Sequence, residues 1–166
     1  VAVMAPTEIL AEQHYLKFKQ WLEPLGLSVA WLSGSQRKKA KAQNKAALSD
    51  GLIQIAVGTH ALFQDDVQFQ NLGLVIVDEQ HRFGVAQRLA LKNKGADVHQ
   101  LMMSATPIPR TLAMSFFADL DVSVIDELPP GRTLLTSRVL IGVRRSEVEG
   151  LVLGACRKGQ QAYWVC

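Results

Sequence analysis

The feature that most constrains the fold is a continuously apolar run that ends in two carboxylates. Leu74-Val75-Ile76-Val77 is followed directly by Asp78-Glu79-Gln80-His81. A run without polar residues is typical of a parallel strand that is covered on both faces. Ligands of open α/β sheets gather at the carboxyl ends of such strands. The run therefore predicts a parallel sheet with a polar site where Asp78 follows the strand.

Further apolar runs alternate with segments of helical periodicity. Strands are expected at Val1 to Ala5, Ser28 to Leu32, Ile53 to Val57, Leu72 to Asp78, Gln100 to Ser104 and Val122 to Asp126. Helices are expected at Thr7 to Glu23, with Thr7 as the N-cap, at Ser35 to Ser49 and at Thr111 to Phe117. This alternation predicts an α/β fold in which helices flank a parallel sheet.

A proline-rich break divides the chain. Leu128-Pro129-Pro130-Gly131-Arg132 cannot continue a helix or a central strand. Beyond it we expect a strand at residues 134–141, a helix at 144–158 and a strand at 160–166. That stretch is shorter than the roughly 40 residues that usually fold alone, so it predicts the opening of a second α/β domain. The chain also begins and ends inside strand-like runs, which indicates a piece of a longer protein.

Composition narrows the class of protein. Hydrophobic residues make up 48% and charged residues 20% of the 166 residues, as in soluble globular proteins. The net charge of +3 permits a nucleic-acid partner without requiring one. The spacing of Cys156 and Cys166 matches no zinc or redox pattern, and no apolar run reaches the ~18 residues that span a bilayer. We therefore expect a cytoplasmic protein without a membrane partner.

The acidic pair has a chemical interpretation. Mg²⁺ binds one or two carboxylates together with waters and substrate phosphates, which suits Asp78. Glu79 could orient or deprotonate an attacking water. Asp and Glu also close strands and begin turns, so this pattern alone leaves both interpretations open.

A second candidate segment follows the apolar run Leu101-Met102-Met103. Ser104-Ala105-Thr106-Pro107-Ile108-Pro109-Arg110-Thr111 combines small hydroxyl residues with two prolines that fix φ. Small residues let the backbone pass close to a neighbouring site. Taken alone, the segment is more typical of a proline turn before a helix.

Three loops precede predicted helix starts. They are Pro6-Thr7-Glu8, Ser33-Gly34-Ser35 and Gly58-Thr59-His60. Helix N-termini, hydroxyls and backbone amides are typical contacts to phosphates. Ordinary N-capping explains each loop alone, but three loops at corresponding strand ends indicate one surface that faces a nucleic-acid backbone.

These segments occur in the order of superfamily 2 helicase motifs and resemble the RecG family of DNA helicases from end to end. The matching stretches are Asp78 to Arg88 (the Walker B motif, or motif II, and its extension), Ala5 to His14 (motif Ia), Val57 to Leu62 (motif Ib), Ser104 to Ala113 (motif III), Ile125 to Arg132 (the linker between two motor lobes) and Gln161 to Cys166 (the start of motif IV).

The resemblance implies a RecA-like helicase lobe at residues 1–127 without its P-loop strand, a linker at 128–132 and the beginning of a second RecA-like lobe at 133–166. By family, Asp78 would hold Mg²⁺ through water, Glu79 would activate the hydrolytic water, and Gln80 and His81 would couple the nucleotide to DNA. Ser104, Ala105 and Thr106 would relay the nucleotide state. The DNA-backbone track would include Pro6, Thr7, Glu8, Gly34, Gly58, Thr59 and His60.

The implied parent is a bacterial, cytoplasmic, monomeric enzyme that uses ATP and Mg²⁺ to translocate on double-stranded DNA. It would remodel stalled replication forks and Holliday junctions in recombination and repair.

No Gly-x-x-x-x-Gly-Lys-Ser/Thr loop occurs in these residues. The arginine finger and the junction-binding wedge domain are also expected elsewhere in the polypeptide. The piece should therefore be inactive without the rest of the motor, and prone to associate through an unpaired sheet edge.

Two alternatives remain open. The transcription-repair coupling factor Mfd shares Phe83-Gly84-Val85 and the Thr106 to Thr111 stretch, but carries a second Glu where this chain has Gln80. Its linker also differs from Glu127 to Arg132. A non-catalytic nucleic-acid-binding module would explain the phosphate-facing loops and the basic helix at residues 35–49.

Overall fold

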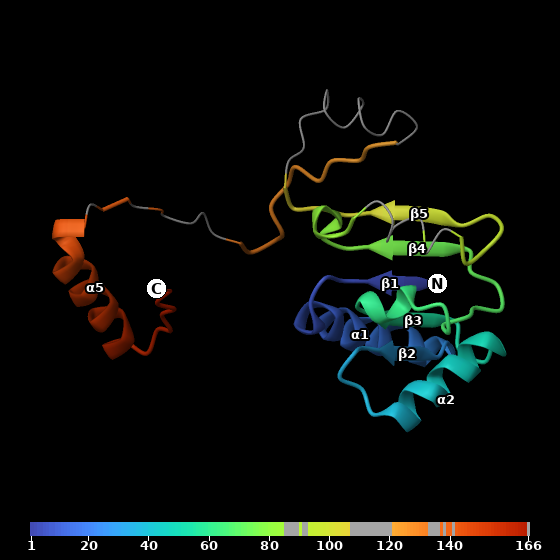
Figure 1. Ribbon diagram of the computed structural model, residues 1–166. Coiled ribbons are helices and arrows are strands. Elements are labelled where there is room, and N and C mark those ends of the chain that lie inside the picture. Colours follow the sequence, from blue (N-terminus) through green and yellow to red (C-terminus); the bar gives the residue numbers. More distant parts are fainter. Residues whose placement is uncertain are drawn as a thin grey trace. The chain divides into compact units, whose positions relative to one another are not determined.

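The central element is a five-stranded parallel sheet with the strand order β2-β3-β1-β4-β5 (Figure 1). Its strands are β1 (Ala2–Met4), β2 (Val29–Leu32), β3 (Ile55–Gly58), β4 (Leu74–Val77) and β5 (His99–Met102). The computed structural model describes residues 1–84, 90, 93–106, 121–132, 137, 139–140 and 142–165. The predicted parallel sheet is confirmed.

Within the described residues of the sheet-bearing part lie the helices α1 (Glu8–Leu22) and α2 (Lys38–Ser49). Short 3₁₀ turns lie at Glu23–Leu25, His60–Phe63 and Gln80–Arg82. Thr7 has an extended backbone, and its hydroxyl accepts a hydrogen bond from the N–H of Leu10 at 3.4 Å. The predicted N-cap of α1 is thereby confirmed, and Glu8 lies in the first turn, where the helix dipole favours an acid.

Apolar side chains cover both faces of the sheet. The central strand β1 shows this directly, because Ala2 and Met4 point to one face and Val3 to the other, and all three are buried. The face of Val3 packs against Tyr15, Phe18 and Leu22, and the other cluster includes Leu48 of α2. Burial on both faces explains why β4 could be found from its unbroken apolar run.

The structure shifts one helix start. Residues 35–37 precede α2, which begins at Lys38 rather than at Ser35. The N–H and the hydroxyl of Ser35 are bonded to the carboxylate of Glu8, so they do not start a helix. Local helix propensity yields here to a contact with a distant residue.

Two predicted strands are wrong. Residues 122–126 and 160–165 are irregular. A strand is stable only when its N–H and C=O groups pair with a neighbour, and neither segment joins a ladder in the described chain. The predicted helix at 111–117 and most of the strand at 134–141 lie outside the described residues.

The chain divides into two compact units, Val1–Asp119 and Leu120–Cys166. The second unit contains a 3₁₀ turn, Gly142–Arg144, and helix α5 (Arg145–Arg157). Ion pairs link Arg144 to Glu147 at 2.7 Å and Arg145 to Glu149 at 2.9 Å. The predicted division at residues 127, 128–132 and 133 stays a prediction. None of the described helices is long and apolar enough to cross a lipid bilayer.

Candidate nucleotide and nucleic-acid site

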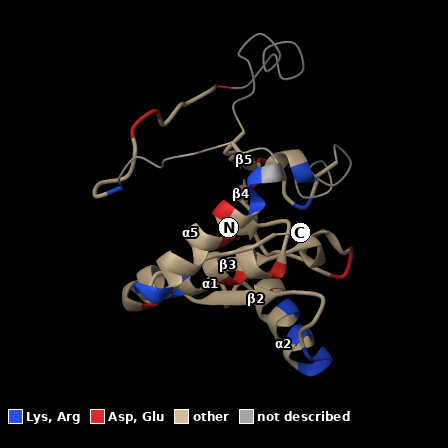
Figure 2. Cartoon of the chain, turned by 90° about the vertical axis from the view of Figure 1, so that its left-hand side faces the viewer, with Lys and Arg blue, Asp and Glu red and all other residues tan. Residues whose placement is uncertain are grey.

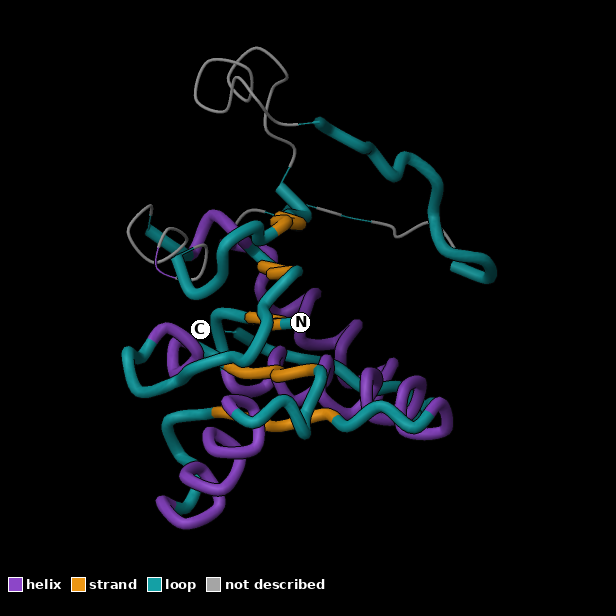
Figure 3. Tube along the Cα trace, turned by 90° about the vertical axis from the view of Figure 1, so that its right-hand side faces the viewer, coloured by secondary structure: helices purple, strands orange, loops and turns teal. Residues whose placement is uncertain are grey.

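All five strands are parallel and end at one edge of the sheet, to which their arrowheads point in Figure 1. Figure 3 shows the strands in orange, stacked side by side. The register aligns Leu32 with Gly58, Gly58 with Met4, Met4 with Val77, and Val77 with Met102. Backbone bonds continue the ladder one step further, from Asp78 N to Met4 O at 2.8 Å and from Met103 N to Val77 O at 2.8 Å. The predicted acidic turn, the Ser104 segment and the three loops therefore follow neighbouring strand ends.

The carboxylate of Asp78 is held by two donors. Its Oδ1 accepts the N–H of Glu79 at 2.9 Å, and its Oδ2 lies 2.7 Å from His14 Nε2. The side chain is 21% exposed, so solvent still reaches it. From the sequence, His14 is expected to be a packing or surface residue, because nothing in the α1 pattern indicates a partner 64 residues away.

Glu79 has an unusual backbone. Its φ of 50° and ψ of 50° place it in the left-handed region, and no other non-glycine residue of the described ranges has a positive φ. This conformation costs an L-residue about 1–2 kcal/mol. Glu79 Oε2 is buried without a hydrogen bond from any described residue, although His81 Nδ1 lies 3.3 Å away. Gln80 Oε1 is also buried without a hydrogen bond from any described residue. Strain combined with orphaned polar atoms is typical of functional sites.

The acidic turn and the Ser104 segment are adjacent. Gln80 N donates to Met103 O at 3.1 Å, which ties the turn after β4 to the exit of β5. Ser104 Oγ accepts the N–H of Thr106 at 3.2 Å, so a compact turn forms around the exposed Ala105. The structure thus brings Asp78 to His81 together with Ser104 to Thr106. Residues 85–88 and 107–113 of the matching motifs lie outside the described residues.

Glu8 joins the first two loops. Its carboxylate accepts the N–H of Ser35 at 3.2 Å and the hydroxyl of Ser35 at 2.9 Å. Ser33 Oγ lies 3.0 Å from Ser35 Oγ and completes the cluster. The hydrogen bonds from Ser35 lower the pKa of the Glu8 carboxyl below its usual value of 4.5. The Glu8 carboxylate therefore organises the Ser33 to Ser35 loop.

Gly58 and Thr59 fix the third loop. A Cβ at Gly58 would lie 1.9 Å from the carbonyl oxygen of Leu32, so only glycine allows β2 and β3 to run this close. Thr59 is buried, and its hydroxyl oxygen finds no hydrogen-bond partner within the part of the chain that the structure describes. A Cβ at Gly34 would lie 4.0 Å from His60 Cε1, which places the second and third loops side by side.

The acidic turn offers the type of ligand that Mg²⁺ takes. The described residues contain no group of three or more His, Cys, Asp and Glu that could hold an ion. Mg²⁺ takes one or two carboxylates and completes its shell with waters and phosphate oxygens. Asp78 offers a partly exposed carboxylate, and the next residue, Glu79, has a buried carboxylate oxygen without a hydrogen bond from the described residues.

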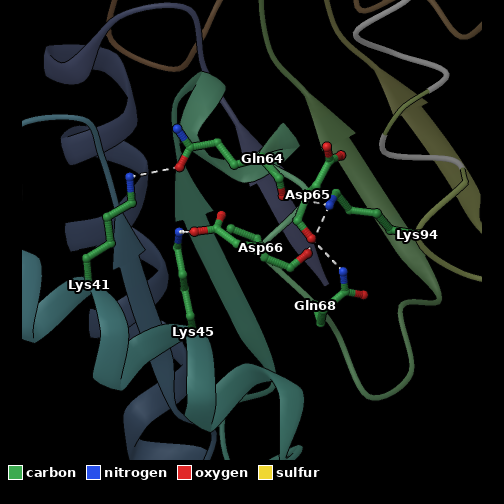
Figure 4. A network of polar contacts seen from close by, with 8 residues as sticks. Lys41, Lys45, Gln64, Asp65, Asp66, Gln68 and Lys94 are labelled. Carbon is green, nitrogen blue, oxygen red and sulfur yellow. Dashed lines mark hydrogen bonds and ion pairs between the residues drawn. The ribbon is translucent and has the colours of Figure 1, made fainter.

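A polar network anchors the segment that follows the Gly58 loop (Figure 4). Lys94 Nζ donates to the carbonyl oxygens of Gln64 and Val67, each at 2.9 Å, and burial lowers the pKa of Lys94. Lys41 Nζ donates to Gln64 Oε1 at 3.0 Å, and Lys45 forms an ion pair with Asp66. Lys and Arg residues gather along α2 (Figure 2), but these two lysines are bound to the protein itself.

A family model of DEAD/DEAH box helicases matches residues 1–115. The chain belongs to the DEAD/DEAH box helicase family. It is 58% identical over 171 residues to an ATP-dependent DNA helicase RecG of Escherichia coli O157:H7. The matched region covers 100% of this chain and 25% of that protein. It is 52% identical to the RecG helicase of Aquifex aeolicus, over 98% of this chain and 21% of that protein.

A solved structure of RecG bound to a three-way DNA junction is similar with a TM-score of 0.78 and 46% identity, over 95% of this chain and 21% of that chain. The predicted resemblance to RecG and the RecA-like fold are thereby confirmed. The chain spans about a quarter of the length of the curated relatives it matches.

Proposed function

We propose that this chain is the part of an ATP-dependent DNA helicase in which the nucleotide and DNA sites meet, and that the helicase acts on branched DNA. One observation carries the proposal: the acidic turn at Asp78 and the turn at Ser104 are hydrogen-bonded neighbours on the edge that also bears the three loops. The named RecG relatives support the same function, and neither Mfd nor a non-catalytic module is favoured.

The proposed roles of the acidic turn are supported by its contacts. Asp78 would hold Mg²⁺ through water, and the ion would neutralise charge on the nucleotide phosphates. Glu79 would orient the attacking water and take its proton, because its buried Oε2 has an unused lone pair. Gln80 and His81 lie next in the turn, where they would sense the nucleotide.

The turn at Ser104, Ala105 and Thr106 would transmit the nucleotide state, since the N–H of Gln80 donates to Met103, the residue just before this turn. The phosphate-facing surface would consist of the loops at residues 6–8, 33–35 and 58–60. The hydroxyls, backbone amides and helix N-terminus there suit phosphates and carry no base specificity.

The wider assignment follows the family resemblance. We propose residues 1–127 as the first motor lobe, 128–132 as the linker and 133–166 as the start of the second lobe. These 166 residues hold no Gly-x-x-x-x-Gly-Lys-Ser/Thr loop, so ATP hydrolysis would need further polypeptide. The full-length protein would translocate as a monomer on double-stranded DNA in the bacterial cytoplasm. It would remodel stalled forks and Holliday junctions in recombination and repair.

The test is DNA-stimulated ATP hydrolysis by the full-length protein with Glu79→Gln. Loss of a general base lowers turnover by about 10²–10⁴-fold, while nucleotide binding should persist. The matched control is Glu12→Gln, the same change at an exposed position of α1. Undiminished turnover in the Glu79→Gln protein would remove this residue from the reaction.

A further inference from the structure

The contact between His14 and Asp78 joins two distant parts of the first unit. His14 lies on α1, Asp78 follows β4, and their Nε2 and Oδ2 atoms are 2.7 Å apart. The two side chains are only 27% and 21% exposed, so water competes weakly for the bond. A bond of this length to an ionised acceptor belongs to the stronger class of hydrogen bonds.

The chemistry of the two groups fixes the direction of this bond. An ionised carboxylate can only accept, so His14 Nε2 must carry the proton and donate it to Asp78. The imidazole is therefore held with Nε2 protonated for as long as the carboxylate is charged. An amide donor at the same place could make the same bond, whereas an aromatic ring without nitrogen could not.

The bond also controls the residue after Asp78. A carboxylate is planar, so fixing Oδ2 fixes Oδ1, which accepts the N–H of Glu79. That second bond supports the left-handed backbone of Glu79, which is otherwise unfavourable. Without His14, the Asp78 side chain would be free to rotate, and the orientation of the Glu79 carboxylate would lose its support.

The same helix also reaches the phosphate-facing loops. Glu8, in the first turn of α1, holds Ser35, and His14 lies about two turns further along. Tyr15, Phe18 and Leu22 pack α1 against the sheet, so Glu8 and His14 are held on one fixed helix.

We propose that His14 is a positioning residue that sets the carboxylate of Asp78 and, through it, the turn at Glu79. This inference rests on the proposed function, because it assigns Asp78 to the Mg²⁺–nucleotide complex. His14 itself touches neither substrate nor metal in this account.

The first experiment measures the contact without activity. In the full-length protein labelled with ¹⁵N-histidine, the ring signals of His14 are assigned by their loss in the His14→Gln variant. We expect the Nε2-protonated tautomer, and a clear shift of the His14 signals in Asp78→Asn. The exposed His99 serves as the control whose signals stay in place. Unchanged His14 signals in Asp78→Asn would refute the contact whatever the protein does with ATP.

The second experiment separates positioning from folding. Loss of a residue that orients a metal-binding carboxylate typically weakens metal affinity 10–100-fold. We expect His14→Phe to raise the half-saturating Mg²⁺ concentration for binding of a fluorescent ADP by roughly 10-fold or more. His14→Gln should restore much of the affinity because its amide can donate.

The two outcomes that would overturn the inference differ from failure of the proposed function. A His14→Phe protein with the wild-type melting temperature and wild-type Mg²⁺ dependence would show that His14 does not position Asp78. Equal losses in His14→Phe and His14→Gln would also overturn it, because the donor would then be irrelevant. If the wild-type protein showed no Mg²⁺-dependent binding of nucleotide, the proposed function would instead be refuted. The histidine spectra would still show whether His14 contacts Asp78.

Discussion

The backbone N–H of Gln80 donates to the carbonyl oxygen of Met103 at 3.1 Å, and this bond joins the exits of two adjacent strands. Because β4 and β5 are parallel and in register, their following residues must lie together at one edge. A change in the acidic turn can therefore reach the Ser104 turn without crossing the core.

Acid should loosen the loop at Ser35. The pKa of Glu8 is lowered in the folded protein, so its hydrogen bonds stabilise the loop fully above the usual value of 4.5. That contribution is lost as the pH falls through the lowered folded pKa. The protection factor of the Ser35 amide against hydrogen exchange, measured by NMR at a series of pH values, should fall below about pH 4.5 in wild type. Glu8→Gln should show faster exchange already at neutral pH, and an identical pH profile in the two proteins would contradict the role of Glu8.

Gly58→Ala should destabilise the first unit. The added Cβ would meet the backbone oxygen of Leu32 at 1.9 Å, and a backbone atom cannot move aside as a side chain can. Overpacking of this kind costs about 1–3 kcal/mol. Urea unfolding provides the measurement, with Gly73→Ala as the control, because a Cβ there has no described atom within 4 Å. Equal unfolding midpoints would show that β2 and β3 can separate freely at this edge.

Lys94→Met should also lower stability, by about 1 kcal/mol. The substitution keeps much of the apolar stem but leaves the carbonyl oxygens of Gln64 and Val67 without their donor. Part of the loss is offset because water can reach this partly exposed site. Lys39→Met, at an exposed position of α2, removes the same charge without such bonds and should be near neutral. A loss of stability at Lys94→Met no larger than at Lys39→Met would show that the bonds from Lys94 to Gln64 and Val67 do not stabilise the fold.

The 166-residue chain on its own should associate. Strand β5 pairs with β4 on one side, and its other edge has no strand partner within the described ranges. Leu101 on this strand is 49% exposed, and unpaired edges with apolar side chains invite pairing between chains. Sedimentation should show mass that rises with concentration, and Leu101→Lys should reduce it. A monomer with one sharp, concentration-independent melting transition would contradict this expectation.

The parts of the fold that were predictable from sequence depend on local patterns. The unbroken apolar run of β4 and the Thr7 cap of α1 each reveal an element without knowledge of its partners. The predicted strand at residues 160–166 failed because local pattern does not say whether a neighbouring strand is present, and the structure shows residues 160–165 as irregular. The late start of α2 depends on Ser35 meeting Glu8, which lies 27 residues earlier.

The candidate site was predictable in its residues but not in its geometry. The motif order placed Asp78 to His81 and Ser104 to Thr106 in the site, and parallel strands bring these segments together. The left-handed backbone of Glu79 has no sequence signal, because glutamate rarely adopts it. The His14 contact likewise arises only in the folded chain, where His14 of α1 meets the residue that follows β4, 64 positions later.

The central claim is that the acidic turn and the Ser104 turn face one nucleotide. Mn²⁺ can replace Mg²⁺ and broadens NMR signals of nearby nuclei. In the full-length protein with methyl-labelled methionine and valine, Mn²⁺ with a non-hydrolysable ATP analogue should broaden the methyl signal of Met103. The Val98 methyls, before the opposite end of β5, should stay sharp. Equal broadening at both positions, or broadening at Val98 alone, would contradict the account.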